Sequence, residues 1–362
     1  MLRSFKAAGL LSVAAVLLAA LTGLAAGTAT AAAGGDTVTA CESAGTTGMT
    51  AKLVVSSPET VSGVVVDAAG CDIGIYVGPG ASNAVIEDDT VTGANDHGVL
   101  VQDVADVTVR DNRIVHNGVA KKSGLGEDKA LTLLGTTGAV VEGNLVSDNV
   151  GDGGISVNDD GGSVPSAVPT PGADRPALDN VISGNTVVGN LGGCGIVVSA
   201  YNPAGGVIGN EVIDNIVAGT PGVLPPLSPP VTGSIVVAAD LPATVASRNT
   251  VSGNLVTGSF IAGVIVHSNA PGDRVSGTTI VNNTLAWNDW GHTDGPPTAV
   301  GIVVASGSAN ASTPSVLADT VIAGNRIDHQ DIGIWISQAV GTHVGGRGLN
   351  HATIPVQWAT AP

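Results

Sequence analysis

Apolar and polar residues along the chain follow one repeating pattern of short apolar runs and asparagine-containing turns. Residues 184–198 read GNTVVGNLGGCGIVV, in which two asparagines five residues apart enclose valines and a second apolar run follows. The first part recurs as VRDNRIVHN, VEGNLVSDN, ISGNTVVGN, VIGNEVIDN, ASRNTVSGN, IVNNTLAWN and IAGNRIDHQ, preceded by the variant IEDDTVTGA. The second part recurs as GVLV, ALTL, GISV, GIVV, SIVV, GVIV, GIVV and GIWI. Short apolar runs bounded by Gly and Asn predict β-strands.

Alignment of these copies places equivalent residues in columns. The leading column is Asp89, Asn112, Asn144, Asn185, Asn210, Asn249, Asn283 and Asn325. Five residues further on, the copies carry Asn117, Asn149, Asn190, Asn215, Asn254, Asn288 and Gln330. One coil cannot bury its own apolar face, so we expect coils stacked about 4.8 Å apart. The columns then predict asparagine ladders, with Asn144, Asn185 and Asn210 directly over one another.

The spacing between copies is irregular, from 23 residues (Asp89 to Asn112) to 42 residues (Asn283 to Asn325). The excess length falls in Pro- and Gly-rich stretches such as 165–176 and 220–230, which we interpret as loop insertions. No helical periodicity is visible, which argues against ankyrin or tetratricopeptide arrays.

The unit G-N-x-[VI]-x-x-N followed by G-[IV]-x-[VI] resembles the repeat of right-handed parallel β-helix proteins of the pectate-lyase-like superfamily. The resemblance covers roughly residues 53–346 and implies an all-β, right-handed parallel β-helix, a solenoid of about ten coils with loop insertions. That superfamily includes polysaccharide lyases, hydrolases, epimerases and non-catalytic surface proteins, so the resemblance leaves the activity open. The catalytic motifs of its pectate lyases, polygalacturonases and epimerases have no match in this chain.

Residues 1–33 have the pattern of a secretory signal peptide. Arg3 and Lys6 precede an apolar run over 7–24, and small residues over 29–33 supply a cleavage site. We expect an N-terminal cap and first coils over 34–83, repeats over 84–346 and a C-terminal cap or tail over 347–362. The protein is therefore expected to be secreted, without a membrane span after cleavage, and monomeric.

Composition supports strands and turns, since the 362 residues include 52 glycines and only 2% aromatic residues. The net charge of −17 disfavours nucleic acid and anionic lipid as partners. In an exported chain Cys41 and Cys71 are candidates for a disulfide, which would leave Cys194 as a buried thiol.

Candidate chemistry is expected on outward-facing residues and loops, because the interior of a solenoid is packed. One column, four residues after the leading asparagine, contains His116, Asp148, Gly189, Asp214, Gly253, Trp287 and His329. His116 and Asp148 would be neighbours on adjacent coils, within reach for a catalytic acid–base pair. The alternative is a solvated pair at a corner.

A second cluster lies in WNDWGHTDG, with Trp287, Asp289, Trp290, His292 and Asp294 within eight positions. Exposed indoles are suited to stacking on sugar rings, and His329 should lie beside Trp287. The alternative is that the tryptophans hold this loop against the solenoid.

A third cluster, Asp152, Asp159 and Asp160, supplies oxygen ligands that suit a calcium ion. Aspartates that form turns are the alternative interpretation.

Two functions stay open. The protein interacts with an extracellular polysaccharide or cell-envelope glycan, by binding or by lyase- or hydrolase-type processing, or it is a non-catalytic scaffold of the envelope. The enzymatic interpretation requires at least three of these charged or aromatic residues to converge beside the solenoid.

Overall fold

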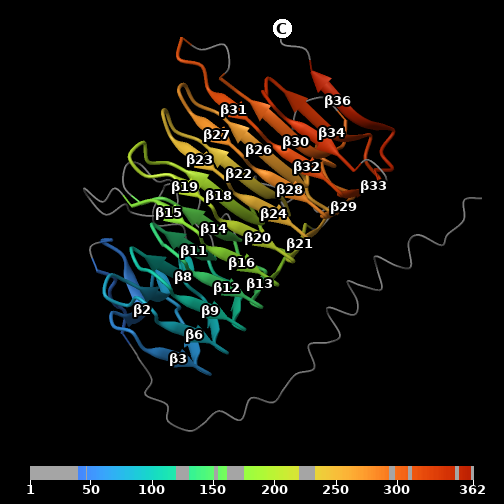
Figure 1. Ribbon diagram of the computed structural model, residues 1–362. Helices are drawn as coiled ribbons and strands as arrows, with labels where there is room; N and C mark the ends of the chain where they lie inside the picture. The colour runs from blue at the N-terminus through green and yellow to red at the C-terminus, as the bar shows by residue number, and fades with distance from the viewer. Residues whose placement is uncertain are drawn as a thin grey trace, which may run out of the picture. The chain divides into compact units, whose positions relative to one another are not determined.

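Figure 1 shows the computed structural model, which describes residues 40–45, 47–119, 130–150, 154–160, 175–219, 233–292, 298–308, 312–346 and 350–359. The regular elements of these residues are all β-strands, arranged in four sheets. Successive coils follow one another in chain order from β3 to β36 (Figure 1). The predicted parallel β-helix of stacked coils is confirmed.

The twelve-stranded sheet carries the second apolar run of each repeat. Its strands, in spatial order, are β1 (Glu42–Ser43), β2 (Thr50–Val55), β5 (Ile73–Val77), β8 (His97–Gln102), β11 (Leu131–Leu134), β14 (Ile155–Asn158), β18 (Ile196–Ala200), β22 (Ile235–Ala239), β26 (Val264–Ser268), β30 (Val300–Ser306), β34 (Ile332–Ser337) and β36 (Ile354–Ala359). β1 pairs with β2 in the antiparallel sense, whereas the pairs from β2 onward are parallel.

Two further sheets carry the asparagine-containing part of each repeat. The ten-stranded sheet consists of β3 (Thr60–Ser62), β6 (Val85–Glu87), β9 (Thr108–Arg110), β12 (Val140–Glu142), β16 (Val181–Ser183), β20 (Glu211–Ile213), β24 (Thr250–Ser252), β28 (Thr279–Val281), β32 (Val321–Ala323) and β35 (His343–Gly345). The nine-stranded sheet consists of β4 (Val65–Asp67), β7 (Thr90–Thr92), β10 (Arg113–Val115), β13 (Leu145–Ser147), β17 (Thr186–Val188), β21 (Ile216–Ala218), β25 (Leu255–Thr257), β29 (Thr284–Ala286) and β33 (Arg326–Asp328). A five-stranded sheet is added in the later coils by β15 (Ala177–Leu178), β19 (Val207–Ile208), β23 (Val245–Ser247), β27 (Arg274–Ser276) and β31 (Val316–Ala318).

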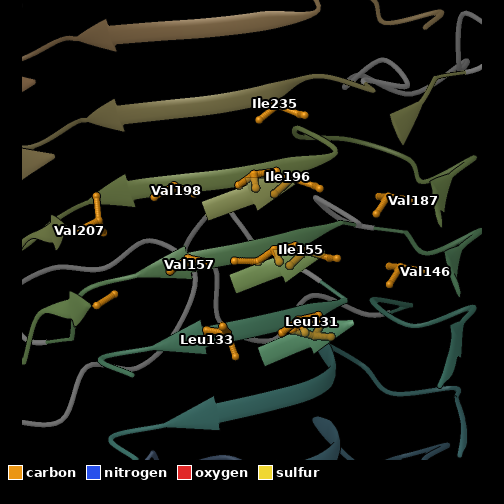
Figure 2. Close-up of a cluster of buried hydrophobic side chains, with 14 of the residues drawn as sticks. Leu131, Leu133, Val146, Ile155, Val157, Val187, Ile196, Val198, Val207 and Ile235 are labelled. Atoms are coloured by element: carbon orange, nitrogen blue, oxygen red, sulfur yellow. The ribbon is translucent and has the colours of Figure 1, made fainter. Parts of the chain in front are cut away.

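The core consists of aliphatic columns that run through successive coils. Leu131, Ile155, Ile196 and Ile235 occupy equivalent positions on neighbouring strands, and Figure 2 shows their side chains one above another. All four are completely buried. Because each such side chain contributes about 1.5–3 kcal/mol on burial, the columns supply much of the stability that a chain poor in aromatic residues needs.

Buried asparagines form the predicted ladders. Nδ2 of Asn144 donates to Oδ1 of Asn185 at 3.0 Å, and Asn185 repeats this bond to Asn215 at the same distance. We call this ladder the central asparagine column; it runs through Asn112, Asn144, Asn185, Asn215, Asn254, Asn283 and Asn325. Each side chain thereby bonds to the coil on either side, so that buried amide groups stay satisfied.

The expected register is wrong at two coils. Asn210 does not follow Asn185 but belongs to a separate ladder, in which it accepts a hydrogen bond from Asn180 at 2.8 Å and donates to Asn249 at 3.2 Å. Asn215 and Asn254 take the expected places of Asn210 and Asn249. The physical reason is that corners recur every five residues along one coil, so a shift by five residues superimposes asparagine on asparagine.

Cys41 and Cys71 form a disulfide, as the sequence suggested, and it ties the start of the described chain to the first coils. Cys194 is partly buried and does not take part in this disulfide. No helix among the described residues is long and apolar enough to cross a membrane. The disulfide is consistent with an extracellular protein. The expected signal peptide, residues 1–33, lies outside the described residues.

Candidate functional site

One row of outward-facing residues follows the nine-stranded sheet along the solenoid. The last residues of its strands are in register from Val115 to Asp328, so the residue after each strand occupies the same corner in every coil. We call this row the corner column; it consists of His116, Asp148, Gly189, Gly219, Gly258, Trp287 and His329. Because of the shifted register, Gly219 and Gly258 replace the expected Asp214 and Gly253. Three consecutive corners therefore have no side chain.

The four side chains of the corner column share one backbone conformation. His116, Asp148, Trp287 and His329 have φ values between 56° and 60°. In this left-handed conformation the residue turns the chain, and the Asn or Gln that follows points into the solenoid. Asn117, for example, donates through Nδ2 to Oδ1 of Asn149 at 3.1 Å. The buried ladder thus holds each corner side chain outward.

His116 and Asp148 lie on adjacent coils at one end of the glycine run, and both are exposed. The structure records no hydrogen bond or ion pair between these two described residues. A Cβ atom added to Gly189 would lie 3.1 Å from Oδ1 of Asp148, so the carboxylate extends over the next coil. Asp148 therefore presents hydrogen-bond acceptors at the start of the glycine run.

Trp287 and His329 lie at the other end of the glycine run and stack on each other. Their ring centroids are 3.9 Å apart and the planes differ by 16°, which confirms the prediction that these side chains are neighbours. The Trp287 side chain is 47% exposed. His329 lies on the following coil, and the equivalent corner of the preceding coil is Gly258, which has no side chain.

Two further residues of the tryptophan-containing segment, Asp289 and Trp290, have structural contacts. Trp290 meets Phe260 edge to face, with centroids 4.6 Å apart. Asp289 is buried, and its Oδ2 accepts the N–H of Val300 at 3.1 Å. For Trp290, these contacts favour the interpretation that it holds the turn to the solenoid. His292 is exposed, and Asp294 lies outside the described residues.

A polar group adjoins the Trp287–His329 stack. Arg326 Nε donates to Oδ2 of Asp328 at 2.7 Å, and His351 Nδ1 lies 2.5 Å from Oδ1. Partial burial alone would raise the pKa of Asp328, but the hydrogen bonds and charges of Arg326 and His351 outweigh it and hold that pKa below its usual value. This end of the column therefore carries a balanced set of charges.

The aspartates proposed as calcium ligands have other partners. Oδ1 and Oδ2 of Asp159 accept backbone N–H groups of Tyr201, Asn202 and Gly206 at 2.7, 3.1 and 2.7 Å. Burial raises the pKa of Asp159 to about 6, although these hydrogen bonds act in the opposite direction. Asp160 is buried and accepts a hydrogen bond from Gln102 at 3.1 Å.

These bonds match the turn-forming interpretation of the aspartates. Asp152 lies outside the described residues. Within the described ranges, no group of three or more His, Cys, Asp or Glu side chains is placed to hold a metal ion.

A second polar cluster, which we did not predict from the sequence, lies at the carboxyl ends of strands in the twelve-stranded sheet. Asp240 accepts hydrogen bonds from Ser199 at 2.5 Å and Asn269 at 3.0 Å, and His267 Nδ1 lies 3.8 Å from its Oδ1. The two titratable side chains are each 22% exposed. A histidine at an outward position of a strand was the available signal. In its coil this cluster lies at the far end of β26 from the corner column.

Comparison with protein families gives one match, to the model described as "Right handed beta helix region", over residues 53–285. A comparison with curated proteins gave no match.

Solved structures with a similar fold include proteins of different function. The A-module of mannuronan C-5 epimerase AlgE4 from Azotobacter vinelandii is 16% identical, with 85% of this chain and 90% of that chain covered and a TM-score of 0.35. PfbA, a surface adhesin of Streptococcus pneumoniae, is 9% identical, with 82% and 81% covered and a TM-score of 0.43. The catalytic domain of a GH87 α-1,3-glucanase is 11% identical, with 87% and 63% covered and a TM-score of 0.35. These similarities carry no argument about the activity of this chain.

Proposed function

The chain belongs to the right-handed β-helix family, and we propose that it is a secreted, glycan-binding member that holds an extended polysaccharide along the corner column. The observation that supports this function is the arrangement of one exposed, half-open indole at Trp287, three glycine corners and the Asp148 carboxylate in a single row. An indole face stacks on a sugar ring, and carboxylate oxygens accept hydrogen bonds from sugar hydroxyls.

The dimensions favour an extended chain as the ligand. Asp148 and Trp287 are four coil steps apart, which corresponds to about 19 Å at about 4.8 Å per step. A chain of several sugar rings is needed to contact both. The glycine corners between them add no side chain of their own to this row.

The same arrangement favours binding without turnover. A catalytic acid and base must lie within hydrogen-bond reach of the same reacting group. The described residues His116 and Asp148 lie on adjacent coils without a hydrogen bond between them, and the glycine run separates both from Trp287 and His329. Fewer than three of the charged or aromatic candidates therefore meet at one place in this row. The candidate catalytic roles of His116 and Asp148 are therefore replaced in this proposal by ligand binding.

A glycan-retention experiment tests the proposal. The mature protein and its Trp287→Ala variant are applied to a panel of immobilised neutral and acidic polysaccharides, and reducing ends and unsaturated products are assayed with and without Ca²⁺. We expect retention without product, and an affinity about tenfold lower for Trp287→Ala. Trp358→Ala is the matched control, because this tryptophan is 55% exposed but lies on β36.

Two outcomes would contradict the proposal. Absence of retention on every glycan would leave the scaffold function, and equal losses in the Trp287 and Trp358 variants would show that the corner column is not the binding site. Thermal unfolding of each variant establishes that the change acts on binding and not on folding.

A further inference from the structure

We propose that the glycan is neutral and that it lies along the solenoid axis against the outer face of the nine-stranded sheet, beside the corner column. This inference rests on the proposed function and adds the charge class of the ligand and the surface that it covers. The observation that supports this inference is the distribution of charged residues on and around that face.

The face carries no charged residue over five successive coils. The middle residues of β13, β17, β21, β25 and β29 are buried in the core, so the first and third residues of each strand point outward. The first residues are Leu145, Thr186, Ile216, Leu255 and Thr284, all partly exposed. The third residues are Ser147, Val188, Ala218, Thr257 and Ala286; Val188 is partly exposed and the other four are buried. All ten positions lack a charge.

Charged residues reappear at the borders of this face. Arg113 lies on β10 at one end and Arg326 on β33 at the other. Within the five coils of the uncharged face, the neighbouring ten-stranded sheet has the exposed residues Glu142 and Glu211. An uncharged area of five coils is therefore a local feature of a chain whose net charge is −17.

This charge pattern selects against charged polysaccharides. A polyuronate would meet no cation on the face, would have carboxylates beside Asp148 and Asp214 at its borders, and would be repelled by the net charge of the chain. A cationic glycan would find no carboxylate on the ten outward positions and would meet Asp148 and Asp214 only at the borders. A neutral sugar chain can place its apolar ring faces on Leu, Ile and Val, and its hydroxyls can bond to the partly exposed hydroxyl groups of Thr186 and Thr284.

The test adds a charge to the face and compares ligand classes. Binding of laminarin, dextran and cello-oligosaccharides is measured beside binding of alginate and polygalacturonate, at low and high salt. The variants are Thr186→Lys on β17 and Thr250→Lys on β24. These threonines are the first residues of three-residue strands with the same burial pattern, on the nine- and ten-stranded sheets respectively, so Thr250→Lys is a matched control.

We expect a neutral glycan to bind with little salt dependence, and Thr186→Lys to weaken it about fivefold while Thr250→Lys has no effect. Salt-sensitive binding of polyuronates alone would overturn the inference, as would equal effects of the two lysines. In either case, if glycan affinity still falls in the Trp287→Ala variant, the proposed function remains supported. Absence of binding to every glycan would instead contradict the proposed function.

Discussion

The backbone N–H of Asp89 donates to Oδ1 of Asn112 at 2.9 Å, so an aspartate begins the central asparagine column. Oδ2 of Asp89 is buried without a hydrogen-bond partner. In the coils from Asn112 to Asn283 the corresponding atom is the Nδ2 that donates to the next Oδ1. A carboxylate at this position therefore lacks the proton that the ladder requires.

Asp89→Asn is expected to stabilise the protein at neutral pH. Burial, followed by the nearby charges of Asp88 and Glu87, raises the pKa of Asp89 from 3.8 to about 6, although the N–H of Val64 acts against this rise. An amide supplies the missing donor at every pH. We expect the free energy of unfolding at pH 7 to increase by roughly 2–3 kcal/mol, measured by urea denaturation.

The pH dependence follows from the sign of that pKa shift. Between pH 4 and pH 6 the folded chain keeps a proton on Asp89 that the unfolded chain has released, so this residue's contribution to stability falls as the pH rises through that range. Above about pH 6 it is constant. The Asp89→Asn variant should lose this part of the pH profile, and an unchanged profile would contradict the assignment.

Gly189→Asn is expected to block glycan binding without unfolding the protein. The position has φ +66°, which Asn tolerates, and the corner column already holds Asp148 and Trp287 in this conformation. The new side chain would project into the path of the glycan. We expect an affinity at least fivefold lower by calorimetry, with a free energy of unfolding changed by about 1 kcal/mol.

Gly277→Asn is the control for this substitution. Gly277 follows β27, at a corner between the five- and ten-stranded sheets, and has φ +65°. If the control variant shows a similar change in the free energy of unfolding but no loss of affinity, the corner column is the path of the ligand. A loss of affinity in both variants would indicate a general effect on the fold.

The Cys41–Cys71 disulfide is expected to stabilise the first coils. It joins residues 30 positions apart, and loop closure of that length contributes about 3–4 kcal/mol. The double variant Cys41→Ser/Cys71→Ser should unfold at a lower temperature and be insensitive to reductant. Cys194→Ser, which leaves the disulfide in place, should keep the reductant sensitivity of the unmodified protein.

The strands were predictable from the sequence because apolar alternation reports directly on burial. The eight second runs, from GVLV to GIWI, all occur in the twelve-stranded sheet. The asparagine register was harder to predict. Asn180, Asn185 and Asn190 mark three corners of one coil, so an N-x-x-x-x-N pair aligns equally well one corner too early.

That register error also concealed the candidate site. With Asp214 and Gly253 assigned to the corner column, its glycine run was interrupted by a carboxylate. With Gly219 and Gly258 in those places, the run is continuous between Asp148 and Trp287. The Asp240–His267 contact joins the ends of the paired strands β22 and β26, in which Ala239 lies opposite Ser268, so its prediction requires the exact register of these two strands.

The length of the bound glycan tests the central claim most directly. Affinities of neutral oligosaccharides of increasing length are measured for the unmodified protein, Asp148→Ala, Trp287→Ala and the double variant. If one chain spans the corner column, affinity rises with length until both residues are contacted, and Asp148→Ala weakens long oligosaccharides but not disaccharides. Affinity that is independent of length, or of Asp148 at every length, would contradict the account.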